Sequence, residues 1–133
     1  MKRSNRNIRT KQIYLSAAYE RRPEMIGHRD VLRNAGFEVK ARWLDGAQHN
    51  WDRMSAALKE DYSQIDLEDA QTADIVITFT GGGPRGGRHV EFGVGLATGA
   101  RVILVGHREN IFHWHPDVEV YDSLDDVIRK ALI

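Results

Sequence analysis

The stretch DIVITFTGGGPRGG, residues 74–87, governs the interpretation of the whole chain. Its first half, Asp74–Thr80, is a short apolar run with β-branched residues, which is typical of a buried strand. Its second half, Gly81–Gly87, has five glycines in seven residues and predicts a turn whose backbone can approach a ligand closely. A helix is expected to follow over residues 88–98, with Gly99 as its C-cap.

Four further segments have the pattern of strands. Gln12–Ala17 and Arg101–Gly106 are short apolar runs that predict buried strands. Phe37–Leu44 alternates apolar and polar residues, which predicts a strand with one exposed face. Val118–Tyr121 predicts a short fifth strand.

Helical patterns separate these strands. One helix is expected from Pro23 to a C-cap at residues 34–36. A long helical region runs from Trp51 to about Ala70, with a possible break at Tyr62-Ser63. The last helix is expected over Leu124–Leu132. The apolar residues expected to pack inward are Met25, Ile26, Val31 and Leu32 in the first helix and Met54, Leu58, Ile65 and Leu67 in the second.

The alternation of strands and helices predicts a small, doubly wound α/β fold. Its five parallel strands would be covered by helices on both faces, as in flavodoxin-like or Rossmann-like proteins. We expect one domain over residues 12–133. In such folds ligands bind at the carboxyl ends of the strands, which directs the search to the loops at residues 18–23, 80–87 and 106–116.

The composition excludes several classes of function. The 133 residues include 19 basic and 19 acidic residues, so no global charge selects nucleic acid or an anionic membrane. The absence of cysteine excludes disulfides, thiol catalysis and thiolate metal sites. No segment is apolar enough to span a membrane, and the amino terminus lacks the apolar stretch of a signal peptide. We expect a soluble, cytoplasmic protein.

The charges are not evenly distributed. Residues 1–11 contain five basic residues and no acidic one. The favoured interpretation is a flexible, solvated arm. Binding of nucleic acid through this arm is the less favoured alternative.

The glycine-rich turn matches neither common nucleotide-binding motif. A dinucleotide fingerprint would follow the first strand, and no Gly-Lys-Ser/Thr of a P-loop follows here. The turn is a candidate site because Glu91 lies one turn into the helix that follows it, between Gly87 and Gly93. An ionised carboxylate beside a glycine-walled cavity is suited to attack an electrophilic sugar carbon. The alternative is a surface charge that pairs with Arg88 or Arg101.

Cleavage at a sugar carbon also needs a group that protonates or orients the leaving base. Asp66, Asp69 and Asp74 are the candidates. Asp74 opens a strand at its amino end and is expected to cap or pair locally. Asp66 and Asp69 lie near the end of a helix, where acidic residues oppose the helix dipole.

Several short motifs occur in a familiar order. They are Ile13-Tyr14-Leu15, Asp66-Leu67 eight residues before Asp74, and Gly87-x-x-x-Glu91-x-Gly93 followed by Gly99. In this order and spacing the chain resembles the nucleoside 2-deoxyribosyltransferase family, whose superfamily includes the 2′-deoxynucleoside 5′-monophosphate N-hydrolases. The resemblance covers residues 12–133.

The resemblance implies a function and three catalytic residues. Glu91 would attack the anomeric carbon and form a glycosyl-enzyme intermediate, Asp66 would act near the leaving base, and Tyr14 would orient the nucleophile or line the sugar pocket. Water would complete hydrolysis, or a second base would complete transfer. No cofactor or metal is required. The family also implies a homo-oligomer with a shared pocket, for which the rings of residues 112–115 could form a wall or an interface, or simply be core.

The turn before Glu91 departs from the transferase pattern. Transferases carry an acidic residue there, whereas this chain has Arg85 and Arg88. With Arg21 or Arg22 of the first loop, these arginines could bind a 5′-phosphate. The alternative is surface pairing with Glu20, Glu24 or Asp45. The backbone of the turn would complete the substrate site through Gly82, Gly83 and Gly87.

Two other functions remain open. A catalytically inactive nucleotide-binding module would use the same turn and arginines. A metal site would draw on imidazoles, but His113-x-His115 with His107 and His49 does not match a known ligand spacing. We therefore expect a nucleoside or nucleotide as the small-molecule partner, and neither a metal, a membrane nor nucleic acid.

Overall fold

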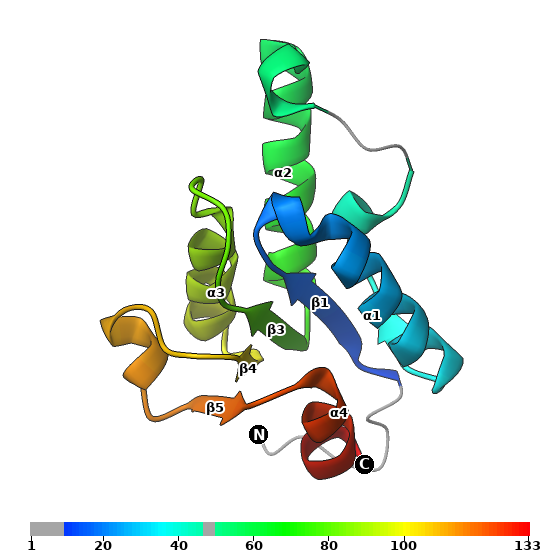
Figure 1. Cartoon of the computed structure of the whole chain (residues 1–133), viewed down its shortest axis with the longest axis vertical. Coiled ribbons are helices and arrows are strands. Elements are labelled where there is room, and N and C mark those ends of the chain that lie inside the picture. The colour runs from blue at the N-terminus through cyan, green and yellow to red at the C-terminus, as the bar shows by residue number, and fades with distance from the viewer. Residues whose placement is uncertain (1–9, 47–49) are drawn as a thin grey trace.

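The computed structural model describes residues 10–46 and 50–133 and contains a five-stranded parallel sheet (Figure 1). The strand order is β2-β1-β3-β4-β5, which is the order of a doubly wound fold. Every neighbouring pair is parallel, as the strand–helix alternation predicted. The strands are β1 (Gln12–Ser16), β2 (Glu38–Val39), β3 (Ile75–Phe79), β4 (Arg101–Val105) and β5 (Val118–Tyr121).

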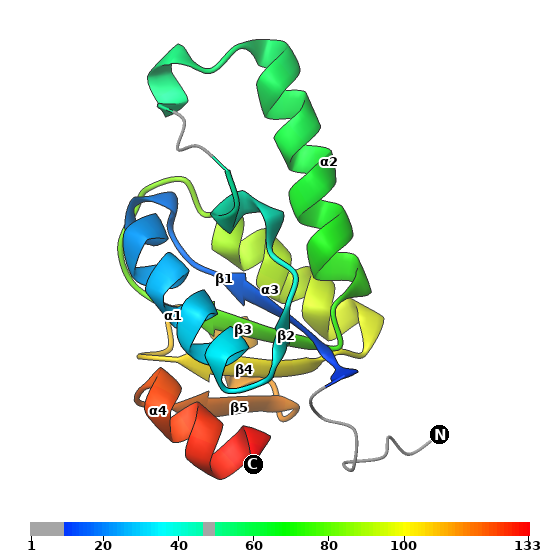
Figure 2. The ribbon, with the colours of Figure 1, turned by 90° about the vertical axis from the view of Figure 1, so that its right-hand side faces the viewer.

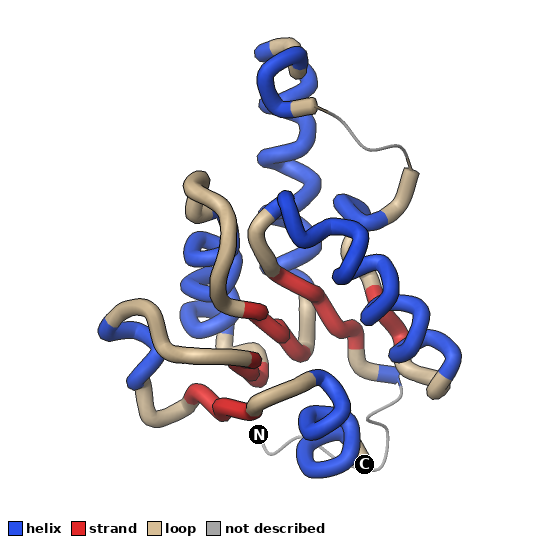
Figure 3. Tube along the Cα trace, in the orientation of Figure 1, coloured by secondary structure: helices blue, strands red, loops and turns tan. Residues whose placement is uncertain are grey.

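Helices cover both faces of this sheet. Figure 2 shows α1 (Arg22–Asn34) and α4 (Leu124–Val127) on one face, with α2 (Ala56–Thr72) and α3 (Gly87–Thr98) on the other. The chain after α4 continues as a π-helix over Ile128–Leu132. The tube in Figure 3 shows the loops after β1, β3 and β4 gathered at one edge of the sheet. The first turns of α2 project beyond that edge (Figure 1).

The central strands are apolar because helices bury both of their sides. All five residues of β3 are buried, as are four of the five residues of β1 and of β4. α3 approaches the sheet very closely at Gly95. A Cβ there would lie 2.9 Å from Cγ2 of Val76 and 3.3 Å from Cγ2 of Val102, so only glycine permits this spacing.

The expected strand over Phe37–Leu44 is wrong beyond Val39. After β2 the chain forms the 3-10 helix η3 (Arg42–Leu44), because Asp69 binds both the backbone N–H and the guanidinium of Arg42. Trp43 is buried there and donates its indole N–H to the carbonyl of Leu15 at 2.9 Å. A 3-10 turn that buries two of its three residues resembles a strand in sequence.

Two details of the helices also differ from the prediction. α2 runs without a break through Tyr62-Ser63, and the segment before it is a separate 3-10 helix, η4 (Trp51–Arg53). Leu67 of α2 and Val31 of α1 were expected to pack inward, but they are 45% and 51% exposed, although Leu32 beside Val31 is buried. Adjacent residues of a helix point in directions about 100° apart, so the narrow face of α1 can bury only one of them.

Some sequence predictions fall outside the described residues. Residues 1–9, most of the expected basic arm, and residues 47–49, including His49, are among them. Within residues 10–46 and 50–133 no helix has the length and apolarity of a membrane span. In the same ranges no group of three or more acidic or histidine side chains is arranged to hold a metal ion.

Candidate active site

Glu91 is held by two hydroxyl groups of the neighbouring strand. It lies in the second turn of α3, which begins at Gly87 after Gly86 in the left-handed conformation. Tyr14 donates its hydroxyl to Oε2 of Glu91 at 2.7 Å, and Ser16 donates its hydroxyl to Oε1 at 2.7 Å. Both donors are buried on β1 and are two residues apart, so they point to the same face of the sheet.

The surroundings of Glu91 favour its protonated form. Burial raises the pKa of Glu91 to about 7, and the negative charges of Asp66 and Asp69 act in the same direction. The hydrogen bonds from Ser16 and Tyr14 oppose this rise. Burial also raises the pKa of Tyr14 well above its usual value, which keeps the phenol a neutral donor. Glu91 is therefore a carboxyl group poised to change its ionisation near neutral pH.

Asp66 is the second acidic group of the site. It lies on α2, and its Oδ1 is buried without a hydrogen-bond partner among the described residues. Burial, followed by the charge of Asp69, raises the pKa of Asp66 to about 6, although Arg42 acts in the opposite direction. A buried carboxyl oxygen without a partner costs stability, so such groups are rare. Those that occur are concentrated at functional sites.

Glu91 and Asp66 both line one cavity of about 490 Å³. The cavity has four aromatic rings in its wall and three cationic side chains around it, a combination suited to a planar, polar ligand. The rings belong to Tyr19, Trp43, Trp51 and Tyr62, and the cations are Lys59, Arg85 and Arg88. Trp51 lies between two of these cations, with Nζ of Lys59 4.1 Å and the guanidinium carbon of Arg85 4.9 Å from its ring centre.

The predicted site residues are distributed unevenly around this cavity. Glu91, Asp66, Gly83, Arg85, Gly87 and Arg88 line it, and Tyr14 joins it through Glu91. Gly82 and Arg21 lie beside it rather than in its wall. An added Cβ on Gly82 would lie 3.6 Å from Cδ of Arg21, whose guanidinium binds the carbonyl of Thr80 and the carboxylate of Glu24.

Arg22 does not reach the cavity. Its side chain is buried and donates to the carbonyls of Trp43 at 3.0 Å and of Gly46 at 3.0 Å. These bonds tie α1 to the segment after β2, which is a structural role. The expectation that Arg22 binds a phosphate is therefore not retained.

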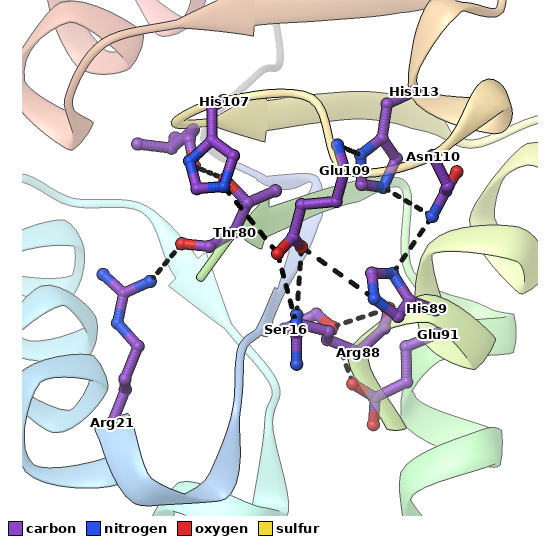
Figure 4. Close-up of polar contacts among 11 residues, drawn as sticks. Ser16, Arg21, Thr80, Arg88, His89, Glu91, His107, Glu109, Asn110 and His113 are labelled. Atoms are coloured by element: carbon purple, nitrogen blue, oxygen red, sulfur yellow. Dashed lines mark hydrogen bonds and ion pairs between the residues drawn. The ribbon is translucent and has the colours of Figure 1, made fainter. Parts of the chain in front are cut away.

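The other two arginines each have an acidic partner. Arg85 binds Glu20 at 2.7 Å, as the alternative reading of the sequence anticipated for such arginines. Nε and Nη2 of Arg88 each lie 3.3 Å from the carboxylate of Glu109 (Figure 4). Burial works against ionisation of Glu109, but Arg88 prevails and lowers the pKa of Glu109.

The ring-rich loop lies outside the cavity wall. His113 is buried against Phe92, and its Nδ1 accepts the backbone N–H of Glu109 at 2.9 Å. Ile111, Phe112 and Trp114, in the 3-10 helix η5 (Ile111–Trp114), are 62–78% exposed. Of the four rings at residues 112–115, only that of His113 is buried.

Sequence reasoning missed Ser16 and the aromatic wall. Ser16 could have been found, because it lies two residues after Tyr14 on a predicted strand and thus shares its face. The wall could not, because its rings come from η2 (Tyr19–Arg21), η3, η4 and α2, which only the folded chain brings together.

Comparison with known proteins supports the fold. No protein-family model and no curated protein sequence matches the chain. A 2-deoxyribosyltransferase from the psychrotolerant bacterium Bacillus psychrosaccharolyticus matches with a TM-score of 0.69 and 22% identity, over 87% of this chain and 89% of that one. The CMP N-glycosidase BcmB of Clostridium botulinum matches with a TM-score of 0.59 and 22% identity, over 90% and 97%. A conserved protein from Enterococcus faecalis V583 has a TM-score of 0.58 and 12% identity, over 90% and 96%.

These similarities define a class of protein. The chain is a doubly wound α/β protein with a five-stranded parallel sheet. More particularly, its fold is that of a 2-deoxyribosyltransferase. The resemblance found in the order of the sequence motifs is thus confirmed for the fold.

Proposed function

We propose that this chain belongs to the nucleoside 2-deoxyribosyltransferase superfamily. As an enzyme of that kind, it would cleave the N-glycosidic bond of a nucleoside or of a (deoxy)nucleoside 5′-monophosphate. One observation carries the proposal: two acidic groups with raised pKa values, Glu91 and Asp66, line the same aromatic cavity. Glu91 is fixed by two hydroxyls, and Asp66 has an oxygen without a partner in the described part of the chain.

The two acids have different roles in the proposed reaction. A carboxylate oxygen of Glu91 attacks C1′ of the sugar and forms a C1′–O bond as the C1′–N bond breaks. The base leaves with the electron pair of the broken bond and takes a proton from Asp66. Water, or a second base, then attacks C1′ and releases Glu91 as a carboxylate. The nucleophile must be ionised and the acid protonated, which is the less populated of the two singly protonated forms because Glu91 has the higher pKa.

The cavity wall supports a nucleobase as the leaving group. Aromatic rings offer flat, apolar faces for stacking a planar base, at about 1–3 kcal/mol per base in other systems. The four rings and the two acids line the same cavity. A nucleoside bound with its base among the rings would place its sugar in the cavity that Glu91 lines.

Arg85 and Arg88 are the residues proposed to bind a 5′-phosphate. They stand at the start of α3, where the turn with Gly83 and Gly87 also offers backbone N–H groups. Their partners, Glu20 and Glu109, already balance both charges. A nucleoside without phosphate would leave these pairs intact, whereas a monophosphate would compete with the two carboxylates.

A base-release assay tests the proposed function. Purified protein is incubated with nucleosides and their 5′-monophosphates, both ribo and deoxy, with and without an acceptor base, and free base is measured by chromatography. We expect release of base that is lost, by about 10⁴-fold or more, in Glu91→Gln. Release without acceptor indicates a hydrolase, and exchange only with acceptor indicates a transferase.

Two outcomes would contradict the proposal. Full turnover by Glu91→Gln would exclude Glu91 as the nucleophile. Tight nucleotide binding without turnover in the wild-type protein, measured by calorimetry, would indicate the inactive binding module instead.

We also propose that the enzyme is a homo-oligomer in which η5 contacts a second copy. Ile111, Phe112 and Trp114 expose large apolar surfaces side by side on this short helix. Sedimentation of the wild-type protein and of a Phe112→Ser, Trp114→Ser double variant tests this. A monomeric wild-type protein, or an unchanged assembly in the variant, would contradict it.

A further inference from the structure

Ser16 is a buried hydroxyl aimed at the carboxyl group on which the proposed reaction depends. Its side chain has no exposed surface, and it is the last residue of β1. It donates to Oε1 of Glu91 at 2.7 Å, within the range of a short, charge-assisted hydrogen bond (Figure 4). Because Tyr14 binds the other oxygen, the carboxylate is fixed at both ends by one rigid strand.

The two donors differ in their alternatives. The hydroxyl of Ser16 also lies 3.3 Å from the carbonyl oxygen of Arg88, one turn earlier on α3. Rotation about its Cβ–Oγ bond can therefore redirect its hydrogen without moving a heavy atom. The hydroxyl of Tyr14 has Glu91 as its one hydrogen-bond partner in the described part of the chain.

This difference matters when the carboxylate becomes an ester. The attacking oxygen turns into an ester oxygen, which is a weaker hydrogen-bond acceptor than a carboxylate oxygen, and the other becomes a carbonyl oxygen. A donor on the attacking oxygen needs a second acceptor if it is not to be left unsatisfied in a buried site. Ser16 has one, in the carbonyl of Arg88.

We propose that Ser16 is a positioning residue that presents Oε1 of Glu91 as the attacking oxygen and transfers its hydrogen bond to the Arg88 carbonyl as the ester forms. The inference rests on the proposed function. The C1′–Oε1 bond forms as the C1′–N bond breaks, and Tyr14 stays on Oε2, the carbonyl oxygen. When water attacks C1′, Oε1 departs with the electron pair, and Ser16 donates to it again.

The proposal predicts effects on ionisation and on one reaction step. Removing the Ser16 hydroxyl removes a bond that favours the carboxylate, so Glu91 should be protonated at higher pH. It also removes a donor from the oxygen that must depart, so breakdown of the glycosyl-enzyme should slow. The other groups that act on Glu91 stay in place: Tyr14 on β1, and Asp66 and Asp69 on α2.

Thr78 provides a matched control. It pairs with Ser16 across β1 and β3, and its side chain is also fully buried. Its Oγ1 has no hydrogen-bond partner among the described residues. Thr78→Val therefore removes a buried hydroxyl at the same level of the sheet without touching Glu91.

The experiment compares the wild-type protein, Ser16→Ala and Thr78→Val. The pH dependence of kcat/KM and the pre-steady-state release of base are measured with the substrate found in the base-release assay. For Ser16→Ala we expect kcat/KM along the acidic limb to fall about tenfold at each pH, because Glu91 must lose a proton that it binds more tightly. We also expect a burst of base followed by turnover slowed about tenfold. Thr78→Val should match the wild-type protein in both. An unmoved acidic limb without a burst in Ser16→Ala would overturn the proposal.

A measurement that needs no turnover separates this proposal from the proposed function. In protein with ¹³C-labelled glutamate carboxyl groups, the Glu91 resonance is assigned by its loss in Glu91→Gln and titrated. It should titrate at higher pH in Ser16→Ala than in the wild-type protein. Equal titrations would overturn the Ser16 assignment. A wild-type protein that releases no base would overturn the proposed function and the ester step, while the titration would still decide on the hydrogen bond. If Ser16→Ala does not fold, Ser16→Cys fills the site with a slightly larger side chain and weakens the donor, and a smaller shift in the same direction is expected.

Discussion

Two aspartates of α2 have opposite hydrogen-bonding environments: Asp66 at the cavity floor, and Asp69 where it binds Arg42, here called the Arg42 corner. At the cavity floor, our name for Glu91 and Asp66 in the cavity wall, Oδ1 of Asp66 is buried without a partner among the described residues, and burial raises the pKa of Asp66 to about 6. At the corner, one turn later on α2, Asp69 accepts the backbone N–H of Arg42 at 2.9 Å and its guanidinium at 2.8 Å. Within the described chain, the same residue type thus has an oxygen without a partner at one position of α2 and is fully paired three residues later.

This difference in hydrogen bonding distinguishes a carboxylate that can act on a substrate from one that stabilises the fold. A fully paired carboxylate stabilises the structure and has no capacity left for a substrate. An unpaired one costs stability and retains that capacity. Asp66 and Asp69 therefore form a natural pair for testing which acid acts in the reaction and which one maintains the fold.

The largest expected effect comes from exchanging each aspartate for asparagine. Asp66→Asn should lower kcat by about 10³-fold, because an amide cannot supply the proton that the leaving base requires. Asp69→Asn should retain activity within a few-fold. Steady-state base release by both variants, at equal concentrations of folded protein, measures the contrast. Equal losses in the two variants would break the distinction.

A smaller effect is expected on the free energy of unfolding when Glu91 is replaced. The folded-state pKa of Glu91 is about 7, above its ordinary value of 4.5, so the folded state binds this proton more tightly than the unfolded chain. Protonated Glu91 therefore stabilises the folded state at low pH, and this stabilisation is lost as the pH rises through 7. Glu91→Gln should therefore be more stable than wild type by on the order of 2 kcal/mol at pH 8, and by little at pH 5. Urea unfolding at both pH values measures this. A variant less stable at pH 8 would contradict it.

The pH dependence of activity should reflect the two acids of the floor together. Between about pH 6 and 7 the pair Glu91 and Asp66 holds one proton, and the reactive form, with that proton on Asp66, is a constant minor fraction of this state because Glu91 has the higher pKa. Activity should be highest there and fall about tenfold for each pH unit beyond either limb. In Asp66→Asn the basic limb should disappear. A basic limb that persists in this variant would show that another group supplies the proton.

The smallest expected effect concerns the Arg42 corner. Asp69→Asn should lower the free energy of unfolding by about 1 kcal/mol, because the hydrogen bond from the Arg42 backbone loses its charged acceptor. Asp66→Asn, by contrast, removes a costly buried charge and should not destabilise the protein. Urea unfolding of the two variants side by side gives the comparison. Destabilisation by Asp66→Asn alone would reverse the assignment of roles.

The sequence predicted those parts of the molecule that depend on local pattern. The apolar runs of β1, β3 and β4 and the glycine-rich turn before α3 were evident, because central parallel strands lack exposed faces. Glu91 and Asp66 were candidates from their residue type and position, and the order of motifs selected Asp66 among the aspartates and added Tyr14. The structure places all three at one site.

The remaining features depend on contacts between distant segments. Arg22 looked as suitable for a phosphate as Arg88, and only the fold shows that its guanidinium faces the carbonyls of Trp43 and Gly46. The 3-10 turn of η3 could not be distinguished from a strand, because the partner that stabilises it, Asp69, is 27 residues away from Arg42. Periodicity reports which side of an element is buried and carries no information about which distant group it meets.

The close approach of α3 to the sheet at Gly95 has a consequence for the acidity of Glu91. Gly95 lies one turn after Glu91, and a methyl group there would collide with Val76 and Val102 and move the helix outward. The two hydrogen bonds that Glu91 receives from β1 span this same interface, so they would lengthen with it. The ionisation of Glu91 is thus under steric control by a residue that has neither charge nor side chain.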